Sequence, residues 1–139
     1  MNACVLCESK GETILWQDRR CRVVLVGDAD HPGYCRVIWN KHVREMTDLT
    51  KSQRAHFMNA VYAVERALRD VLKPDKINLA STGNRIPHLH WHVVPRFEDD
   101  VHFPASIWSA DKHAGVVHTI DREVLVEALY DLLGGRRRD

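Results

Sequence analysis

A run of alternating histidines is the feature that most restricts how this 139-residue chain can fold. Residues 88–96 read HLHWHVVPR, so that His88, His90 and His92 are separated by single apolar residues. In a β-strand, successive side chains point to opposite faces, which would place the three imidazoles on one face, about 6.6 Å apart, and the apolar side chains on the other. We therefore expect a strand that packs its apolar face inward and offers its histidine face to a site.

The rest of the chain predicts a fold of the α+β class, with a mainly antiparallel five-stranded sheet, one long helix and a C-terminal helix. Apolar residues recur at helical spacing over 50–72, where Thr50 and Gln53 can form a capping box at the start. The C-terminal helix is expected over about 121–133, where Gly134 ends it. Short β-rich runs bounded by turn residues predict strands at 13–17, 20–26, 34–40, 77–81 and 89–96.

Composition and charge argue against several classes of protein. Twenty Lys and Arg residues balance nineteen Asp and Glu residues, so the chain lacks the basic field of a general nucleic-acid-binding protein. The basic run Arg136–Arg138 is expected to be a solvated end. The longest apolar run is far shorter than a membrane span, and the charged N-terminal segment is unlike a signal peptide. We expect one cytoplasmic domain over residues 1–139, with no nucleic-acid or membrane partner and with Cys21 and Cys35 as reduced core residues.

Three adjacent imidazoles indicate two kinds of chemistry. A neutral imidazole has a free lone pair and an unperturbed pKa of about 6.5, so it can act as a nucleophile at neutral pH. Alternating histidines can instead bind a catalytic zinc ion, which would require an open coordination position and a nearby carboxylate base. A third interpretation is a partly exposed strand without a chemical role, and the regular alternation argues against it.

The segment His88–Val94 resembles the signature of the histidine triad (HIT) superfamily, in which three histidines alternate with apolar residues. Asn78 and the pair Gly83–Asn84 precede the triad where that family has an amide residue and a Gly-Gln pair, and residues 37–42 match the end of a family strand. The likeness covers about residues 4–108. The chain resembles more particularly a bacterial group of diadenosine tetraphosphate hydrolase-like proteins, which share the downstream pattern of His102–Trp108. The resemblance implies a HIT-like domain.

The resemblance also implies a nucleotide hydrolase or transferase that attacks the α-phosphate of a dinucleoside polyphosphate or a nucleoside phosphoramidate. By position, His90 is the expected nucleophile and forms a covalent nucleotidyl-histidine, while His92 binds the phosphate and assists the leaving group. Asn78 and Asn84 are expected nucleotide or phosphate ligands. Asp28 is a candidate for the ribose contact, and an ordinary turn aspartate is an equally good interpretation of this residue. No organic cofactor is implied, and the protein partner implied by the resemblance is a second copy of the chain, joined through the long helix and a neighbouring strand.

Three positions depart from the family pattern. Tyr34 stands where a histidine usually supports the triad from behind, and tyrosine can donate a hydrogen bond but does not exchange a proton near neutrality. Asn84 is one methylene shorter than the family glutamine, and Trp39 replaces a proline without an evident reason. The change at Tyr34 keeps open an alternative function, that of a nucleotide-binding interaction module with weak turnover.

A Cys-x-x-Cys pair at Cys4 and Cys7 has the spacing of metal ligands but fills only half of a tetrahedral zinc site. Some relatives complete such a site with residues that correspond to His42 and His88, so the resemblance implies a structural zinc ion. The alternative is two reduced cysteines on a loose N-terminal segment. The histidines without a partner at a meaningful spacing are expected at the surface: His31, His56, His113 and His118.

Overall fold

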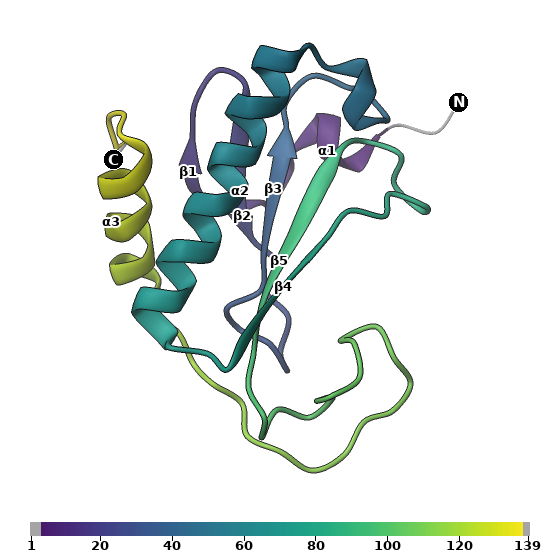
Figure 1. The fold of residues 1–139 in the computed structure, drawn as a ribbon, viewed down its shortest axis with the longest axis vertical. Coiled ribbons are helices and arrows are strands. Elements are labelled where there is room, and N and C mark those ends of the chain that lie inside the picture. The colour runs from purple at the N-terminus through teal and green to yellow at the C-terminus, as the bar shows by residue number, and fades with distance from the viewer. Residues whose placement is uncertain (1–3, 138–139) are drawn as a thin grey trace.

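The computed structural model describes residues 4–137 and contains a five-stranded antiparallel sheet (Figure 1). Residues 1–3 and 138–139, which include Arg138 of the basic run, lie outside the described part. The spatial order of the strands is β1-β2-β3-β5-β4, and each neighbouring pair is antiparallel. The α+β class and the five-stranded sheet are thus confirmed, with strands β1 (Thr13–Gln17), β2 (Cys21–Leu25), β3 (Cys35–Trp39), β4 (Lys76–Ala80) and β5 (His90–Arg96).

The two predicted helices are present and begin and end at the expected signals. Helix α2 (Lys51–Leu72) starts with a capping box, in which Thr50 and Gln53 exchange side-chain and backbone hydrogen bonds. Helix α3 (Arg122–Leu133) is capped by the Asp121 carboxylate, and Gly134 follows its last residue with a φ of 75°. Two shorter helices were not predicted: α1 (Val5–Glu8) and the 3₁₀ helix η1 (Met46–Asp48). Each has too few residues to show a hydrophobic period.

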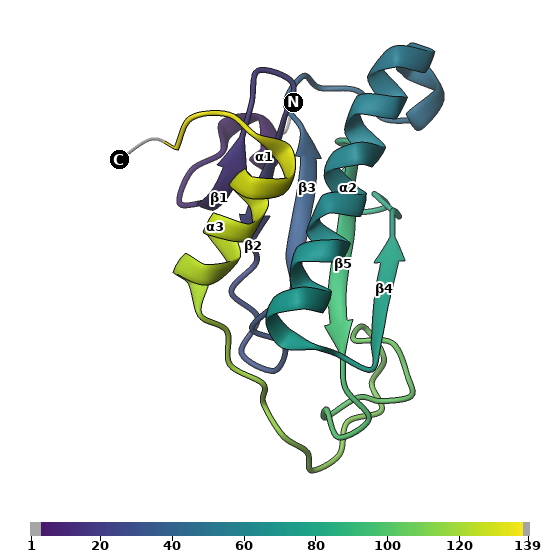
Figure 2. The same cartoon turned by 60° about the vertical axis from the view of Figure 1, so that its left-hand side comes forward.

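The helices α2 and α3 cover one face of the sheet, as the two views of the ribbon show (Figures 1 and 2). Alternate strand residues, among them Val37 and Val93, pack beneath these helices against Phe57 and Leu68. The other side chains of β3 and β5 therefore lie on the opposite face of the sheet, which the two long helices leave uncovered.

Among the described residues, no helix combines the length and apolar character that a membrane span requires.

Candidate active site and metal centre

Only two of the three histidines of the predicted row, His90 and His92, lie side by side on the strand. Strand β5 begins at His90, and His88 lies in the bend before it, which corrects the expectation that all three alternate along one strand. His90 and His92 remain on the open face of the sheet, with ring centroids 4.9 Å apart, and both side chains are buried. The His88 ring turns instead toward the N-terminal cysteines. The first histidine is thus separated from the other two in position and in role.

The backbone of His88 fixes the tautomer of His90. Nδ1 of His90 lies 2.5 Å from the carbonyl oxygen of His88. A carbonyl oxygen can only accept, so Nδ1 of His90 must carry the proton and donate it. Burial lowers the pKa of His90, which keeps the ring neutral near pH 7, and Nε2 is then left with a free lone pair. This is the state that an imidazole nucleophile requires.

Aromatic side chains surround His92. The phenol oxygen of Tyr34 lies within hydrogen-bonding distance of its Nδ1, and the indole of Trp108 meets the ring edge-on with centroids 5.0 Å apart. Burial, and then the neighbouring His90 and Arg36, lower the pKa of His92 to about 4. The ring is therefore neutral at pH 7. Burial raises the pKa of Tyr34, so the phenol keeps its proton and can donate it to His92.

A pocket of about 580 Å³ opens beside these two histidines. Its walls come from β3, from β5, from the loop between β4 and β5, and from the segment after β5. Arg36 and Arg85 contribute positive charge, Asn84 contributes an amide, and Trp108 is 54% exposed at the rim. A cationic pocket with an exposed aromatic ring has the chemistry needed to hold phosphate groups and a base.

The predicted nucleotide ligands have different surroundings. Asn84 lines the pocket with His90 and His92. Asn78 is on β4, and its amide oxygen accepts a hydrogen bond from Arg96. Asp28 lies in the loop between β2 and β3, where its carboxylate accepts from the backbone of residues 30 and 31. That is the geometry of the turn aspartate given above as the other interpretation.

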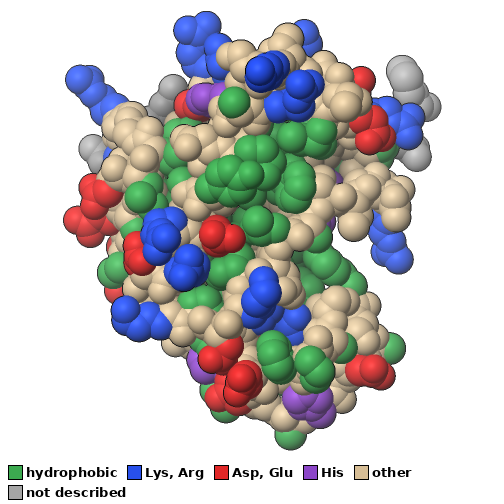
Figure 3. All heavy atoms as spheres, viewed as in Figure 1, with side chains coloured by type: hydrophobic (Ala, Val, Ile, Leu, Met, Phe, Trp, Pro, Cys, Tyr) green, Lys and Arg blue, Asp and Glu red, His purple; other side chains and the backbone are tan. Residues whose placement is uncertain are grey.

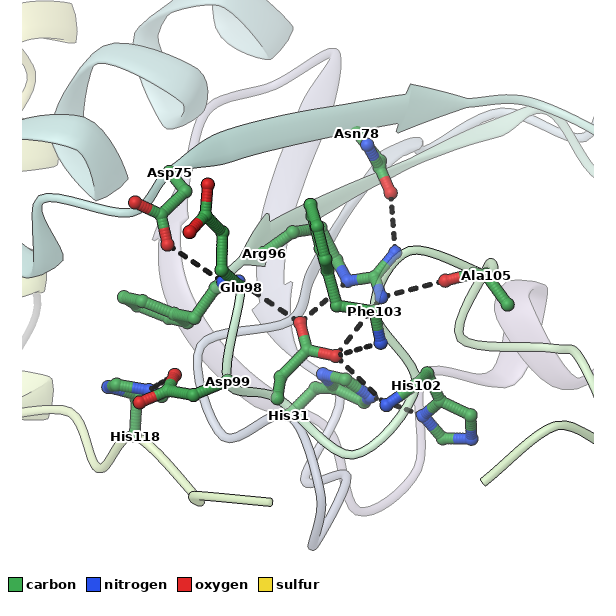
Figure 4. A network of polar contacts seen from close by, with 12 residues as sticks. His31, Asp75, Asn78, Arg96, Glu98, Asp99, His102, Phe103, Ala105 and His118 are labelled. Atoms are coloured by element: carbon green, nitrogen blue, oxygen red, sulfur yellow. Dashed lines mark hydrogen bonds and ion pairs between the residues drawn. The ribbon is translucent and has the colours of Figure 1, made fainter. Parts of the chain in front are cut away.

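A buried ion pair fixes the segment that follows β5 (Figure 4). Asp100 accepts from Nε and Nη2 of Arg96 and from three backbone N–H groups, so its pKa is held well below the usual range although burial alone would raise it. Beside this pair, His31 and His102 stack at 5.0 Å with ring nitrogens 2.8 Å apart. The expectation that His31 is a surface residue is wrong, because its side chain is only 4% exposed. Its partner is 71 residues away, so sequence spacing gave no signal.

The other three histidines expected at the surface without partners are at least partly exposed, but each has a partner. His56 pairs with Asp18 and His118 pairs with Asp99, and neither side chain is fully exposed. The ring of His118 also stacks on Phe97 at 3.6 Å. His113 is exposed, as expected, and its ring nitrogens contact backbone carbonyls. The contacts of His113 and His118 hold the segment after β5 to itself, whereas the contact of His56 joins α2 to the turn between β1 and β2.

The four predicted metal ligands converge. Ligand atoms of Cys4, Cys7, His42 and His88 all lie within 4.8 Å of one another. Nε2 of His88 is 2.6 Å from the carbonyl oxygen of Trp39, so it donates there and leaves Nδ1 unprotonated toward the cysteine sulfurs. Two thiols and two imidazoles are the donor set of a closed tetrahedral zinc site, and an oriented histidine is typical of such sites. The residues present therefore fit zinc.

The sequence matches the HIT domain family over residues 8–99. The chain belongs to the histidine triad family. The HIT fold is also found in a histidine triad protein from Bradyrhizobium japonicum, which is 25% identical and superposes with a TM-score of 0.72 over 91% of this chain and 93% of that one.

Curated relatives of this HIT protein carry the names of nucleotide enzymes. An "AP-4-A phosphorylase" of Mycobacterium tuberculosis is 32% identical over 79 residues, 52% of this chain and 40% of the relative. A "Bis(5'-nucleosyl)-tetraphosphatase [asymmetrical]" of Schizosaccharomyces pombe is 28% identical over 74 residues, 50% of this chain and 41% of the relative. The matches thus span less than half of the length of these two relatives.

Proposed function

We propose that this HIT protein is a nucleotide hydrolase or transferase that attacks the α-phosphate of a dinucleoside polyphosphate or a nucleoside phosphoramidate. The observation that carries the proposal is the free lone pair left on Nε2 of His90. The hydrogen bond from Nδ1 to the His88 carbonyl leaves this nitrogen unprotonated, beside a pocket lined by two arginines and an asparagine. The names of the curated relatives support the same substrate class.

In the proposed reaction, Nε2 of His90 attacks the α-phosphorus. A P–N bond forms while the bond to the leaving group breaks and its electron pair departs with that group. Water then attacks the same phosphorus and loses a proton to solvent, while the P–N bond breaks and its electron pair returns to Nε2. This releases a nucleoside monophosphate. A covalent intermediate divides one difficult displacement into two easier ones.

His92 is suited to assist both displacements. If Tyr34 donates to its Nδ1, the single ring proton of neutral His92 lies on Nε2, which can donate a hydrogen bond to a phosphate oxygen or to the leaving group. Charge in the transition state is spread over the equatorial phosphate oxygens, so donors such as His92 and Asn84 supply much of the stabilisation. Asn78 would act through Arg96, and Asp28 remains a candidate for the ribose.

A structural zinc ion is the second part of the proposal. Cys4, Cys7, His42 and His88 would hold it, and the ion would join helix α1 to the sheet. A catalytic zinc bound by the triad has less support, because His88 faces the cysteines. Among residues 4–137, neither His90 nor His92 belongs to a cluster of three metal-ligating side chains.

We also propose a homodimer formed through α2 and β4. Strand β4 is the last strand of the sheet and pairs on one side only, with β5. Figure 3 shows hydrophobic side chains gathered at the centre of the face seen in Figure 1. Tyr62 on α2 is 56% exposed, and Met58 and Leu79 are only partly buried. Sedimentation should give the mass of two chains, and Tyr62→Glu should give the mass of one.

A substrate panel tests the proposed reaction. Dinucleoside polyphosphates and nucleoside phosphoramidates are compared, and the products are identified by chromatography. Release of a nucleoside monophosphate from each substrate turned over supports attack at the α-phosphate. Release of inorganic phosphate alone would contradict it, and tight binding with no turnover would favour the alternative of a nucleotide-binding module.

A further inference from the structure

Arg36 is a positively charged residue in an otherwise apolar strand. Its neighbours in β3 are Cys35 and Val37, which are fully buried in the core beneath the helices. Alternation along the strand therefore places Arg36 on the opposite face, where its Cα pairs with that of His92 in the register of β3 and β5. The fold places this cation directly beside the proposed catalytic pair.

Within residues 4–137 the Arg36 guanidinium forms no ion pair with an acidic side chain, and its neighbour is the neutral phenol of Tyr34. Its Nε is a buried nitrogen without a hydrogen-bond partner in the described part of the chain, and its Cζ lies 6.0 Å from the centre of the Tyr34 ring. None of the described residues that line the pocket with Arg36 is acidic. A buried donor without an acceptor is uncommon in folded proteins and calls for an explanation such as an absent ligand.

We infer that Arg36 binds the phosphates of the leaving group and makes this pocket selective for polyphosphate substrates over nucleoside phosphoramidates. The inference rests on the proposed function and deepens it. A leaving polyphosphate gains negative charge as its bond to the α-phosphorus breaks, and a guanidinium can donate two hydrogen bonds to such a group. An amine leaving group offers no phosphate oxygen to the guanidinium.

Arg85 shares this pocket but has a different character. Its side chain is exposed and belongs to the loop between β4 and β5, whereas Arg36 is held in the middle of the sheet opposite His92. Arg85 therefore adds attraction for any anion, while Arg36 has the fixed position that selection between leaving groups requires. The structure assigns the specificity to the strand residue.

The bond changes are those of the proposed reaction, with a polyphosphate as the leaving group. Nε2 of His90 forms the P–N bond, the P–O bond to the polyphosphate breaks, and its oxygen takes the electron pair. Arg36 stabilises the resulting charge without exchanging a proton, because a guanidinium stays protonated. Water completes the cycle as before. No further reactant is needed.

The test compares two substrates in three proteins. kcat/KM is measured for diadenosine tetraphosphate and for adenosine phosphoramidate with the wild type, Arg36→Gln and Arg36→Lys. We expect Arg36→Gln to lower the value for the tetraphosphate roughly thirtyfold to hundredfold, because a charge-stabilising donor is lost. The value for the phosphoramidate should change less than about threefold. Arg36→Lys should recover part of the loss.

Binding of inorganic tripolyphosphate gives a readout that a merely structural role would not move. As a competitive inhibitor it should bind Arg36→Gln at least about tenfold more weakly than wild type, while adenosine monophosphate binds both within about threefold. Arg66→Gln is the matched control, because it removes the same charge from an exposed side chain of α2, the helix that covers the other face of the sheet. It should leave both substrates unaffected.

The outcomes separate this inference from the function on which it rests. An equal loss on both substrates, or no loss on either, would overturn the role of Arg36 in leaving-group selection. A wild-type enzyme that prefers the phosphoramidate would overturn the selectivity while leaving attack at the α-phosphate intact. A wild-type protein that turns over neither substrate would contradict the proposed function itself.

Discussion

The phenol oxygen of Tyr34 lies 2.6 Å from Nδ1 of His92. The family usually has a histidine at the position of Tyr34, and here a tyrosine supports the triad from behind. A phenol that keeps its proton can donate to Nδ1, and the single ring proton of neutral His92 then lies on Nε2. The family departure thus preserves a donor toward the pocket.

Replacing this tyrosine tests its role in setting the tautomer. Tyr34→Phe removes only the hydroxyl, so His92 can place its proton on either nitrogen. We expect kcat to fall about tenfold to hundredfold with nucleotide affinity nearly unchanged, because the donor matters most in the transition state. Tyr130→Phe on α3 removes a hydroxyl remote from the pocket and should not change kcat. Equal effects of the two variants would contradict the assignment.

The two histidines of the pair should respond differently to removal. His90→Asn should abolish turnover but leave nucleotide affinity within about tenfold of wild type, whereas His92→Asn should lose about a hundredfold to a thousandfold in kcat. Acid quench with substrate labelled in the α-phosphate should trap labelled wild-type protein and no labelled His90→Asn. Label on another residue would show that the nucleophile is wrongly assigned.

Zinc content tests the metal centre. Protein purified without chelators should contain close to one zinc ion per chain by elemental analysis, and Cys4→Ala should contain little. Binding to the folded state adds stability by mass action, so stripping the metal should lower Tm. Cys35→Ala, a change at a buried thiol outside the cluster, should keep its zinc even if Tm falls. Zinc-free wild type, or an unchanged Tm in Cys4→Ala, would refute the site.

The stability of the fold should depend on the Asp100 carboxylate. Asp100→Asn leaves the buried Arg96 without its ion-pair partner, which typically costs about 3–5 kcal/mol of unfolding free energy. Asp99→Asn changes the adjacent residue, whose contact with His118 is at the surface, and should cost no more than about 1 kcal/mol. Denaturant unfolding of both variants measures the contrast. Similar losses in the two would contradict it.

The pH dependence of stability should reflect His92. Its pKa is about 4 in the folded protein and near 6.5 when unfolded, so the unfolded state binds the proton first as pH falls. The free energy of unfolding should therefore fall between pH 6.5 and 4 on account of this group, by about 1.4 kcal/mol for each pH unit at most. Denaturant unfolding at pH 7 and pH 5 should show a weaker pH dependence in His92→Gln than in wild type. An identical dependence would rule out this contribution.

Regular structure could be predicted from the sequence because local signals determine it. The capping pair Thr50 and Gln53, and Gly134 after α3, mark helix ends that the structure confirms. The strand of the triad was predicted to include His88, because the alternation of residue type continues to that residue, but the backbone bends there and β5 begins at His90. The convergence of Cys4 with His88 came from the resemblance, because 84 residues separate them.

Two features near the site were missed for different reasons. The pairing of His31 with His102 depends on where a long segment returns to the sheet, which no local pattern encodes. Arg36 did carry a signal: it is a charged residue in an apolar strand, at a position that alternation places on the histidine face. Only the strand order revealed that this face is shared with His92.

His88 has two attachments whose joint effect reaches beyond the metal centre. Its ring faces Cys4 and Cys7, and its carbonyl oxygen accepts the proton of His90 that orients the nucleophile. The described residues of the N-terminal segment do not line the pocket. Through the ring of His88, however, they help to fix the position of the His88 carbonyl, which orients the nucleophile. Proteolytic removal of that segment would therefore inactivate the protein without blocking its pocket: substrate would still bind, and the chemical step would fail.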